Sequence, residues 1–251
     1  MEWFDAFTAA YRGRSAALDR AVELKRAHTL RVQQETEDLV SDLGLGGAER
    51  LLPLAAALLH DVGRFEQFAR WGTFDDGKSA NHAELGWRLL TADRELAWLP
   101  PEAQAIILDA VLFHNRARLP VIADPLREAT CRILRDADKL DIWQMVAADY
   151  REHQAVPHTP FYRGLGREGG ISPAVSGAVA RAEPVSFAAV VKLNDYVVLQ
   201  AAMAFDLNYA PSFRRLRDRQ ILVAIRSVLP ADHEVDRMFD AIALHVAQRA
   251  A

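Results

Sequence analysis

Hydrophobic residues recur every three or four positions over most of the chain, which is the period of an amphipathic helix. Residues 15–44 predict the first long helix, which the glycines from Gly44 onward end. Residues 48–65 are apolar nearly all round up to Gly63, so we expect a central, buried helix there. Further helices are predicted over residues 83–93, 101–117, 125–149, 186–208, 212–228 and 232–249.

Two stretches lack this period and predict loops. Residues 69–82 are rich in glycine, aspartate and serine, and Ser79 is placed to cap the helix that follows. Residues 151–172 contain four glycines and two prolines and predict a lid or a linker. Because the alternation typical of strands is almost absent, the predicted fold class is all-α.

The length of 251 residues suits one large domain with a helical extension. Hydrophobic residues make up 51% of the chain, enough for a sizeable core. We expect a domain core in residues 1–150. Residues 151–251 are expected to form a loop and C-terminal helices packed on that same domain, giving a single domain overall.

Charge and cysteine content narrow the classes of function. The 30 basic and 34 acidic residues give a net charge of −4, which disfavours general nucleic-acid binding. The single cysteine, Cys131, excludes an internal disulfide and thiolate metal clusters. No signal-like segment or long uncharged apolar run stands out, so we expect a cytoplasmic protein without a membrane span. Surface valines and leucines would allow a homodimer, although no heptad run specifies one.

Histidines and aspartates stand at core-facing positions and at the ends of predicted helices. His28 lies on the inner face of the first helix, His60 and Asp61 end the apolar helix, and Asp138 lies in LRDADKLD. Such donors suit divalent Mn, Fe, Co, Ni or Zn. The alternative is structural, because a histidine or aspartate near a helix end often caps it or faces solvent. A titratable pair closing an apolar stretch is costly to bury without a metal or hydrogen bonds, and the residues alone leave both interpretations open.

The order His, His-Asp, Asp on separate helices resembles the HD-domain superfamily of metal-dependent phosphohydrolases. The matching stretches are RAHTLRV, ALLHDVGRFEQF and LRDADKLD, within about residues 20–145. The resemblance implies a helical HD-domain bundle with additional C-terminal helices. It also implies metal ligation by His28, His60, Asp61 and Asp138.

Two further histidines, His82 and His114, fall between the His-Asp pair and the last aspartate. This order resembles the HD branches that bind two metal ions. It implies that Asp61 bridges the ions, that His82 and His114 hold one, and that His28, His60 and Asp138 hold the other. Asp136 and Asp138 point in different directions on a helix. Asp138 matches the family pattern and is the expected metal ligand. Asp136 would instead hydrogen-bond to a ligand histidine and orient it, and Asp141 is a weaker candidate for a ligand.

The resemblance implies hydrolysis of a nucleotide or another small phosphoester by a metal-activated water. Asp61 and Arg64 are the predicted catalytic residues, because related proteins often carry a lysine where Arg64 stands. The predicted substrate-binding residues are Arg64, Lys78, Asn115 and Lys139. For each the structural alternative is a solvated surface group or a helix cap. A basic cluster at 214–219 could likewise meet phosphates or form a solvated helix face.

Two other functions use the same residues. Some two-metal HD proteins carry a mixed-valent di-iron site that oxygenates a C–H bond, and the same six ligands would serve it. The chain could instead be a non-catalytic regulatory module that binds a nucleotide. The presence of every expected ligand argues against a degenerate site.

Overall fold

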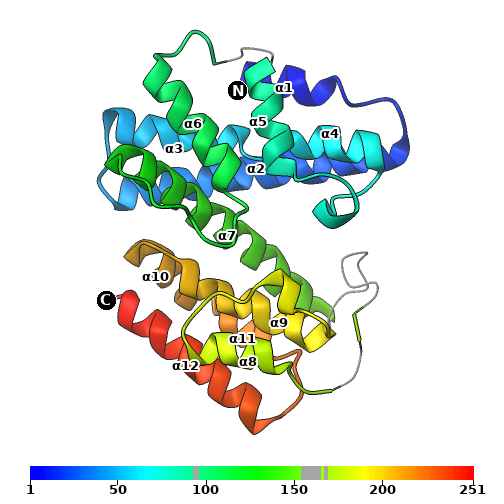
Figure 1. The fold of residues 1–251 in the computed structure, drawn as a ribbon, viewed down its shortest axis with the longest axis vertical. Helices are drawn as coiled ribbons and strands as arrows, with labels where there is room; N and C mark the ends of the chain where they lie inside the picture. The colour runs from blue at the N-terminus through cyan, green and yellow to red at the C-terminus, as the bar shows by residue number, and fades with distance from the viewer. Residues whose placement is uncertain (93–95, 154–164, 167–168) are drawn as a thin grey trace. The chain divides into compact units, whose positions relative to one another are not determined.

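The computed structural model of the protein describes residues 1–92, 96–153, 165–166 and 169–251. Among these residues there are helices and one isolated bridge, between Gly166 and Lys192, but no strand (Figure 1). The all-α prediction is confirmed. The helices are α1 (Glu2–Ala9), α2 (Ala16–Asp42), α3 (Gly47–Leu59), α4 (Val62–Trp71), η1 (Asp76–Lys78), α5 (His82–Ala92), α6 (Pro101–Phe113), α7 (Pro125–His153), α8 (Pro173–Ala180), η3 (Phe187–Ala189), α9 (Leu193–Ala202), η4 (Met203–Asp206), α10 (Ala210–Asp218), α11 (Ile221–Arg226) and α12 (His233–Arg249).

The chain divides into two compact units, Met1–Asp138 and Lys139–Ala251, with the boundary inside α7. The predicted boundary at residue 150 lies later in the same helix. Packing of the C-terminal helices on the first domain stays a prediction. No helix among the described residues has both the length and the apolar character to cross a membrane.

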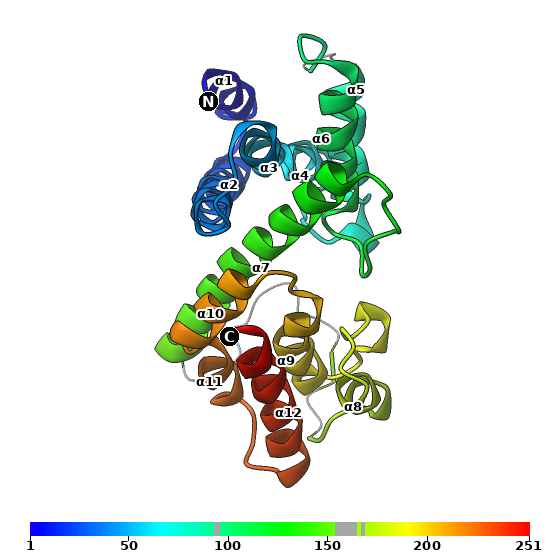
Figure 2. The same cartoon turned by 90° about the vertical axis from the view of Figure 1, so that its left-hand side faces the viewer.

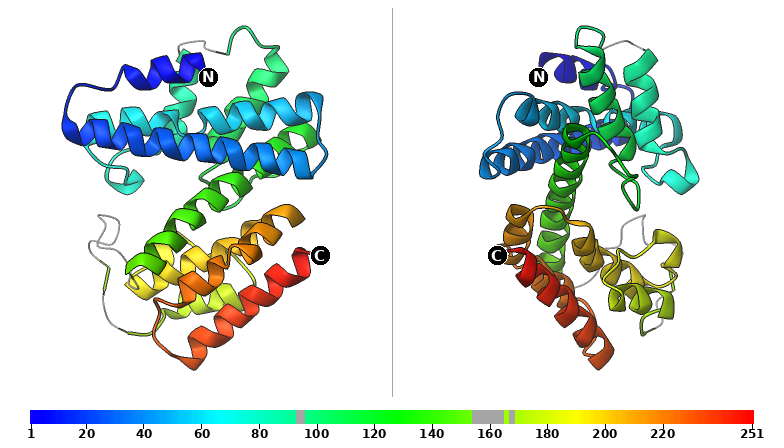
Figure 3. Two further views of the ribbon diagram at one scale, coloured as in Figure 1. Left: turned by 180° about the vertical axis from the view of Figure 1, so that it is seen from behind. Right: turned by 60° about the vertical axis from the view of Figure 1, so that its left-hand side comes forward.

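The N-terminal unit is built around α2. This helix packs along α3 and α4, α4 packs on α5, and α6 contacts both α3 and α5 (Figures 2 and 3). The apolar faces of these helices meet in one core, as their helical periodicity predicts. The most deeply buried members of that core include Phe4, Val22, Val62, Phe65, Ile107 and Val111.

The apolar helix was predicted to end near Gly63, and a second helix that was not predicted follows the His-Asp pair directly. α3 ends at Leu59, and α4 begins at Val62. Asp61 has a non-helical backbone, with φ −108° and ψ 14°, so the chain turns a corner there. α4 then continues to Trp71 and ends at Gly72 in the left-handed conformation, a common helix C-cap. The predicted loop therefore begins three residues too early.

The C-terminal unit departs more from the sequence prediction. The helix expected over 186–208 is broken into η3, α9 and η4, and α8 was not predicted. The helix expected over 212–228 is interrupted at Gln220, which has φ 53° and separates α10 from α11. The prediction for 151–172 is wrong for 151–153, which extend α7, while residues 154–164 and 167–168 lie outside the described residues.

Buried polar contacts tie the end of α7 to α9 within this unit. The Trp143 indole N–H donates to the Gln200 carbonyl at 2.8 Å, and the Tyr150 hydroxyl donates to the Gln200 side chain at 2.6 Å. Both aromatic rings are fully buried, so their polar atoms need such partners. Trp143 is therefore part of the core, whereas Trp98 is 79% exposed.

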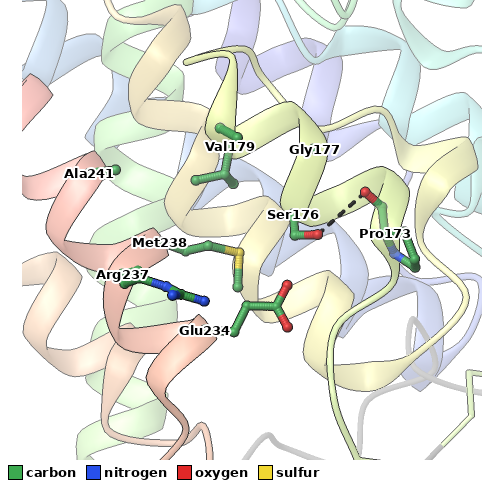
Figure 4. Close-up of a pocket in the computed structure, with 9 residues that line it drawn as sticks. Pro173, Ser176, Gly177, Val179, Glu234, Arg237, Met238 and Ala241 are labelled. Atoms are coloured by element: carbon green, nitrogen blue, oxygen red, sulfur yellow. Dashed lines mark hydrogen bonds between the residues drawn. The ribbon is translucent and has the colours of Figure 1, made fainter.

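A pocket of about 380 Å³ lies between α8 and α12 in the C-terminal unit. Figure 4 shows Glu234, Arg237 and Met238 of α12 opposite Ser176 and Val179 of α8. The Ser176 hydroxyl donates to the Pro173 carbonyl at 3.4 Å. The pocket brings together no group of residues suited to hold a metal ion.

Asp195 links the start of α9 to α8. Its carboxylate accepts hydrogen bonds from the Ser172 backbone and hydroxyl, both at 2.7 Å, and from the backbone of Val191 and Lys192. Burial opposes ionisation of this carboxylate, but the hydrogen bonds outweigh it and lower the pKa of Asp195. Asp195 therefore stabilises the fold while it is ionised.

We predict that Asp195→Asn lowers the free energy of unfolding by about 2 kcal/mol at pH 7, because the amide cannot accept all these bonds. The native pKa is depressed, so wild type holds this advantage above the ordinary value of 3.8 and loses it as pH falls further. Urea unfolding at several pH values measures the difference. Equal stability of the variant and wild type at pH 7 would refute the assignment; the exposed Asp240→Asn is the control.

Candidate metal centre

Six side chains from five parts of the N-terminal unit converge in its interior. His28 comes from α2, His82 is the first residue of α5, and Asp138 lies in α7. His60 and Asp61 occupy the corner between α3 and α4, and His114 directly follows α6. The four histidines and Asp61 are buried, and the Asp138 side chain is 16% exposed.

The first group of potential ligands is His28, His60 and Asp138. The His28 Nε2 atom lies 3.3 Å from the His60 Nε2 atom and 3.3 Å from the Asp138 Oδ1 atom. Potential ligand atoms of all three residues lie within 4.8 Å of one another. Asp138, not Asp136, brings its carboxylate to this group.

The second group is Asp61, His82 and His114. The Nε2 atoms of His82 and His114 are 3.0 Å apart. The Asp61 Oδ1 atom lies 3.6 Å from the first of these nitrogens and 3.8 Å from the second. This group adds the two histidines that extend the four-residue HD pattern.

Asp61 faces both groups. Its other oxygen, Oδ2, lies 3.5 Å from the His28 Nε2 atom and 3.7 Å from the His60 Nε2 atom. The side chain makes no hydrogen bond that caps α4, so helix capping does not explain its burial. One carboxylate oxygen therefore points to each histidine pair.

Hydrogen bonds at the outer nitrogens orient three of the histidine rings. The Nδ1 atoms of His60 and His114 lie 2.7 Å from the carbonyls of Ala57 and Val111, which can only accept. The Nδ1 atom of His82 lies 2.7 Å from a carboxylate oxygen of Asp76. These nitrogens carry the protons, so the inner Nε2 atoms present lone pairs.

Burial keeps these histidines neutral. It lowers the pKa of His60 and of His82, and it lowers the pKa of His114 to about 3. At neutral pH the facing Nε2 atoms of His82 and His114 therefore share no proton. Two lone pairs 3.0 Å apart repel unless a cation lies with them. The donor set thus fits a divalent metal ion, for which neutral imidazole is a common ligand.

The carboxylates of Asp61 and Asp138 supply negative charge that suits a metal cation. Burial alone would raise the pKa of Asp61, but the positive charges of Lys25 and Arg64 hold it well below its usual value. The pKa of Asp138 is also lowered, because the hydrogen bond that its carboxylate accepts from His28 outweighs burial. Ionised aspartates in a buried pocket need a cation or strong donors.

The guanidinium of Arg64 makes contacts that the sequence did not predict. Its Nη1 atom donates to the Gln67 side chain, the Phe74 carbonyl and Asp76 at 2.5 to 2.9 Å. These bonds hold the loop after α4, and a phosphate contact by Arg64 stays a prediction. Its Nε atom lies 3.6 Å from the Asp61 Oδ1 atom, and a catalytic role for Arg64 stays a prediction.

The other predicted substrate residues are placed differently from one another. The Lys78 side chain is 64% exposed and pairs with Asp75. Lys139 belongs to the C-terminal unit, where it pairs with Asp206 at 2.7 Å, so the structure gives no support to a substrate contact. Asn115 lies beside the second group, where its amide donates to Asn81 at 3.0 Å and approaches Asp76 at 3.4 Å.

Sequence reasoning missed the residues that hold the loop before α5. Gln67 is fully buried, and its amide donates to Asp76, Ser79 and the Ala80 carbonyl at 2.8 to 2.9 Å. Asn81, rather than the predicted Ser79, caps α5 by accepting from the Ala83 backbone at 2.9 Å. The loop thereby places the Asp76 carboxylate against His82.

Arg135 was also missed. Its buried guanidinium donates to the carbonyls of Phe113, His114 and Arg116 at 2.6 to 3.0 Å. These carbonyls lie at the C-terminal end of α6, where a cation is favourable. Arg135 thus links α7 to the segment that carries His114. Asp136, on the same helix, is fully buried, and its role in orienting a ligand stays a prediction.

Close helix packing fixes α5 against α4. A Cβ atom built on Gly63 would lie 2.1 Å from the His82 carbonyl oxygen and 2.5 Å from the Gly86 nitrogen. Real Cβ atoms do not approach backbone this closely, so only glycine fits. Gly63 therefore sets the distance between Asp61 and His82.

A comparison with protein-family models matches residues 26–143 to the HD domain. This segment contains all six converging side chains. This segment therefore carries an HD domain, and the resemblance seen in the sequence is confirmed. The family consists largely of metal-dependent hydrolases, and the described residues include His and Asp groups that could hold a metal. No curated protein and no solved structure matches the chain.

We predict that Gly63→Ala lowers the melting temperature by several degrees, because the new methyl group forces α4 and α5 apart. It should weaken metal binding at the second group through the shift of His82. Thermal unfolding and metal content per chain measure the two effects. Gly46→Ala is the control, since nothing lies within 4 Å of its added Cβ; equal behaviour of the two variants would contradict the close-packing argument.

We predict that Asp76→Ala weakens binding of the second metal ion about 10- to 100-fold, because the His82 ring loses the acceptor that orients it. Titration of the metal-free protein with Mn²⁺ measures this loss. Ions held by the first group should bind as in wild type. An unchanged affinity at both positions would exclude an orienting role for Asp76.

Proposed function

We propose that the protein is a metal-dependent phosphohydrolase or phosphodiesterase acting on a nucleotide or another small phosphoester. The observation that carries the proposal is the position of Asp61, whose two oxygens face two separate histidine pairs. This arrangement supports a site for two divalent ions, Mn, Fe, Co, Ni or Zn, with Asp61 shared between them. Asp138 completes the first position.

Two divalent ions bound there would activate a water and screen the negative charge of a phosphate. The protein's own residues prepare this chemistry in three ways. The Nδ1–H bonds of His60, His82 and His114 hold lone pairs inward. Asp61 and Asp138 stay ionised near neutral pH, since their pKa values are held low. Burial of these groups limits competing water, which strengthens their electrostatic effect.

We predict that Asp61→Ala abolishes turnover and lowers the metal content, because both ions lose a shared ligand. Hydrolysis of bis(p-nitrophenyl) phosphate and p-nitrophenyl phosphate, with metal analysis of the same samples, measures the effect. Asp240→Ala, an exposed aspartate of α12, is the matched control. Full activity of the Asp61 variant would overturn the proposal.

The assay is run with Mn²⁺ and without oxygen, because the same six ligands would serve a di-iron oxygenase. Anaerobic hydrolysis by the Mn²⁺-loaded protein supports the hydrolase. Oxygen consumption by an iron-loaded protein without hydrolysis would favour the oxygenase instead. Binding of a nucleotide without metal and without turnover would favour a regulatory module.

A further inference from the structure

Lys25 is a cation at the candidate metal centre that the sequence analysis did not single out. It lies in α2, three residues before His28, so both side chains project from the same face of the helix. Its Nζ atom lies 2.8 Å from the Asp61 Oδ2 atom. The Lys25 side chain is 17% exposed, so the ammonium group is shielded but retains access to solvent.

The other cations considered for phosphate binding, Arg64, Lys78 and Lys139, contact other groups. The Nη1 atom of Arg64 is held by three acceptors in and near the loop after α4. Lys78 lies at the surface with Asp75, and Lys139 pairs with Asp206 in the C-terminal unit. Among these four, Lys25 lies nearest the shared carboxylate, at 2.8 Å, whereas the Arg64 Nε atom lies 3.6 Å from the other Asp61 oxygen.

The position of Lys25 implies that its ammonium would leave Asp61 when a divalent ion binds there. Its ammonium occupies the oxygen of Asp61 that also faces the His28 and His60 nitrogens. A divalent ion held by that oxygen would repel the ammonium at short range. Lysine has a flexible stem and a compact charge, so its head can turn from one anion to another. The ring of Phe74, 5.5 Å from Nζ, keeps the head near the centre.

We propose that Lys25, rather than Arg64, is the cation that binds the phosphate of the substrate. In the metal-free protein Lys25 neutralises Asp61. When metal ions take over Asp61, the ammonium is released and pairs with a phosphate oxygen. This inference rests on the proposed phosphohydrolase function and assigns the residue that recognises its substrate class.

The first test measures metal binding without any reaction. Metal-free wild type, Lys25→Met and Arg20→Met are titrated with Mn²⁺ by calorimetry. Lys25→Met should bind Mn²⁺ several-fold more tightly than wild type, because the metal no longer displaces an ammonium. Arg20→Met, which removes an exposed charge from the same helix, should bind as wild type does. Loss of Mn²⁺ binding in Lys25→Met would overturn the exchange and make Lys25 a structural support of Asp61.

The second test measures phosphate recognition by the Mn²⁺-loaded proteins. Inorganic phosphate should bind Lys25→Met about tenfold or more weakly than wild type, the loss expected for one charged hydrogen bond. Lys25→Arg should keep part of the affinity, and KM for p-nitrophenyl phosphate should rise more than kcat falls. Equal phosphate affinity in Lys25→Met and wild type would overturn the assignment of Lys25.

The two proposals fail separately. Full hydrolysis by Asp61→Ala would refute the phosphohydrolase proposal and, with it, the role of Lys25. Inactive Asp61→Ala combined with unchanged phosphate binding in Lys25→Met would refute the role of Lys25 alone.

Discussion

The burial of Asp61 between four imidazoles is the constraint on which the rest of the site depends. A carboxylate with almost no exposure to solvent is costly unless cations or strong donors surround it. The corner between α3 and α4 creates this position, because the non-helical backbone at Asp61 lets two adjacent side chains enter the core together. Burial lowers the pKa of His60, His82 and His114, so these three rings supply lone pairs rather than charge. The positive charge that compensates the Asp61 carboxylate must therefore come from Lys25, Arg64 or bound metal ions.

The surrounding structure serves to hold these groups at fixed distances. Gln67 and Arg64 shape the loop that presents Asp76 to His82, and Gly63 sets the approach of α5. Arg135 ties the segment around His114 to α7. Each contact joins a helix to another helix or to a loop that carries a histidine or its partner. This is how a helical domain without strands brings six side chains into one centre.

The sequence predicted the fold class from local periodicity, whereas the set of six converging residues came from the resemblance to the HD domain, with helix-end positions as partial support. His60, Asp61, His82 and His114 lie at helix ends, where a polar group beside an apolar run is visible in the sequence. Gln67, Lys25 and Arg135 gave no such signal, since an isolated polar residue in a helix usually faces solvent. Their partners lie outside their own helices, 21 residues away in the Arg135–His114 bond and 36 in the Lys25–Asp61 bond. Arg64 was assigned to substrate by family position, but tertiary contacts occupy its Nη1 atom.

The helix boundaries also depend in part on tertiary contacts that the sequence does not reveal. The sequence indicates that the apolar helix ends at the His-Asp pair, but no local signal shows that a new helix, α4, begins directly after it at Val62. The break at Gln220 also has no local signal, because a non-glycine residue rarely adopts φ 53°. Tertiary packing decides such positions. Helical period alone therefore predicts the elements but not where they bend.

The central claim is that Asp61 is shared by two metal positions. Calorimetric titration of the metal-free protein with Mn²⁺, checked by elemental analysis, tests it most directly. The account predicts two ions per chain, with both positions weakened in Asp61→Ala. One ion per chain would mean that His82 and His114 are not ligands. No bound ion would contradict the metal centre altogether.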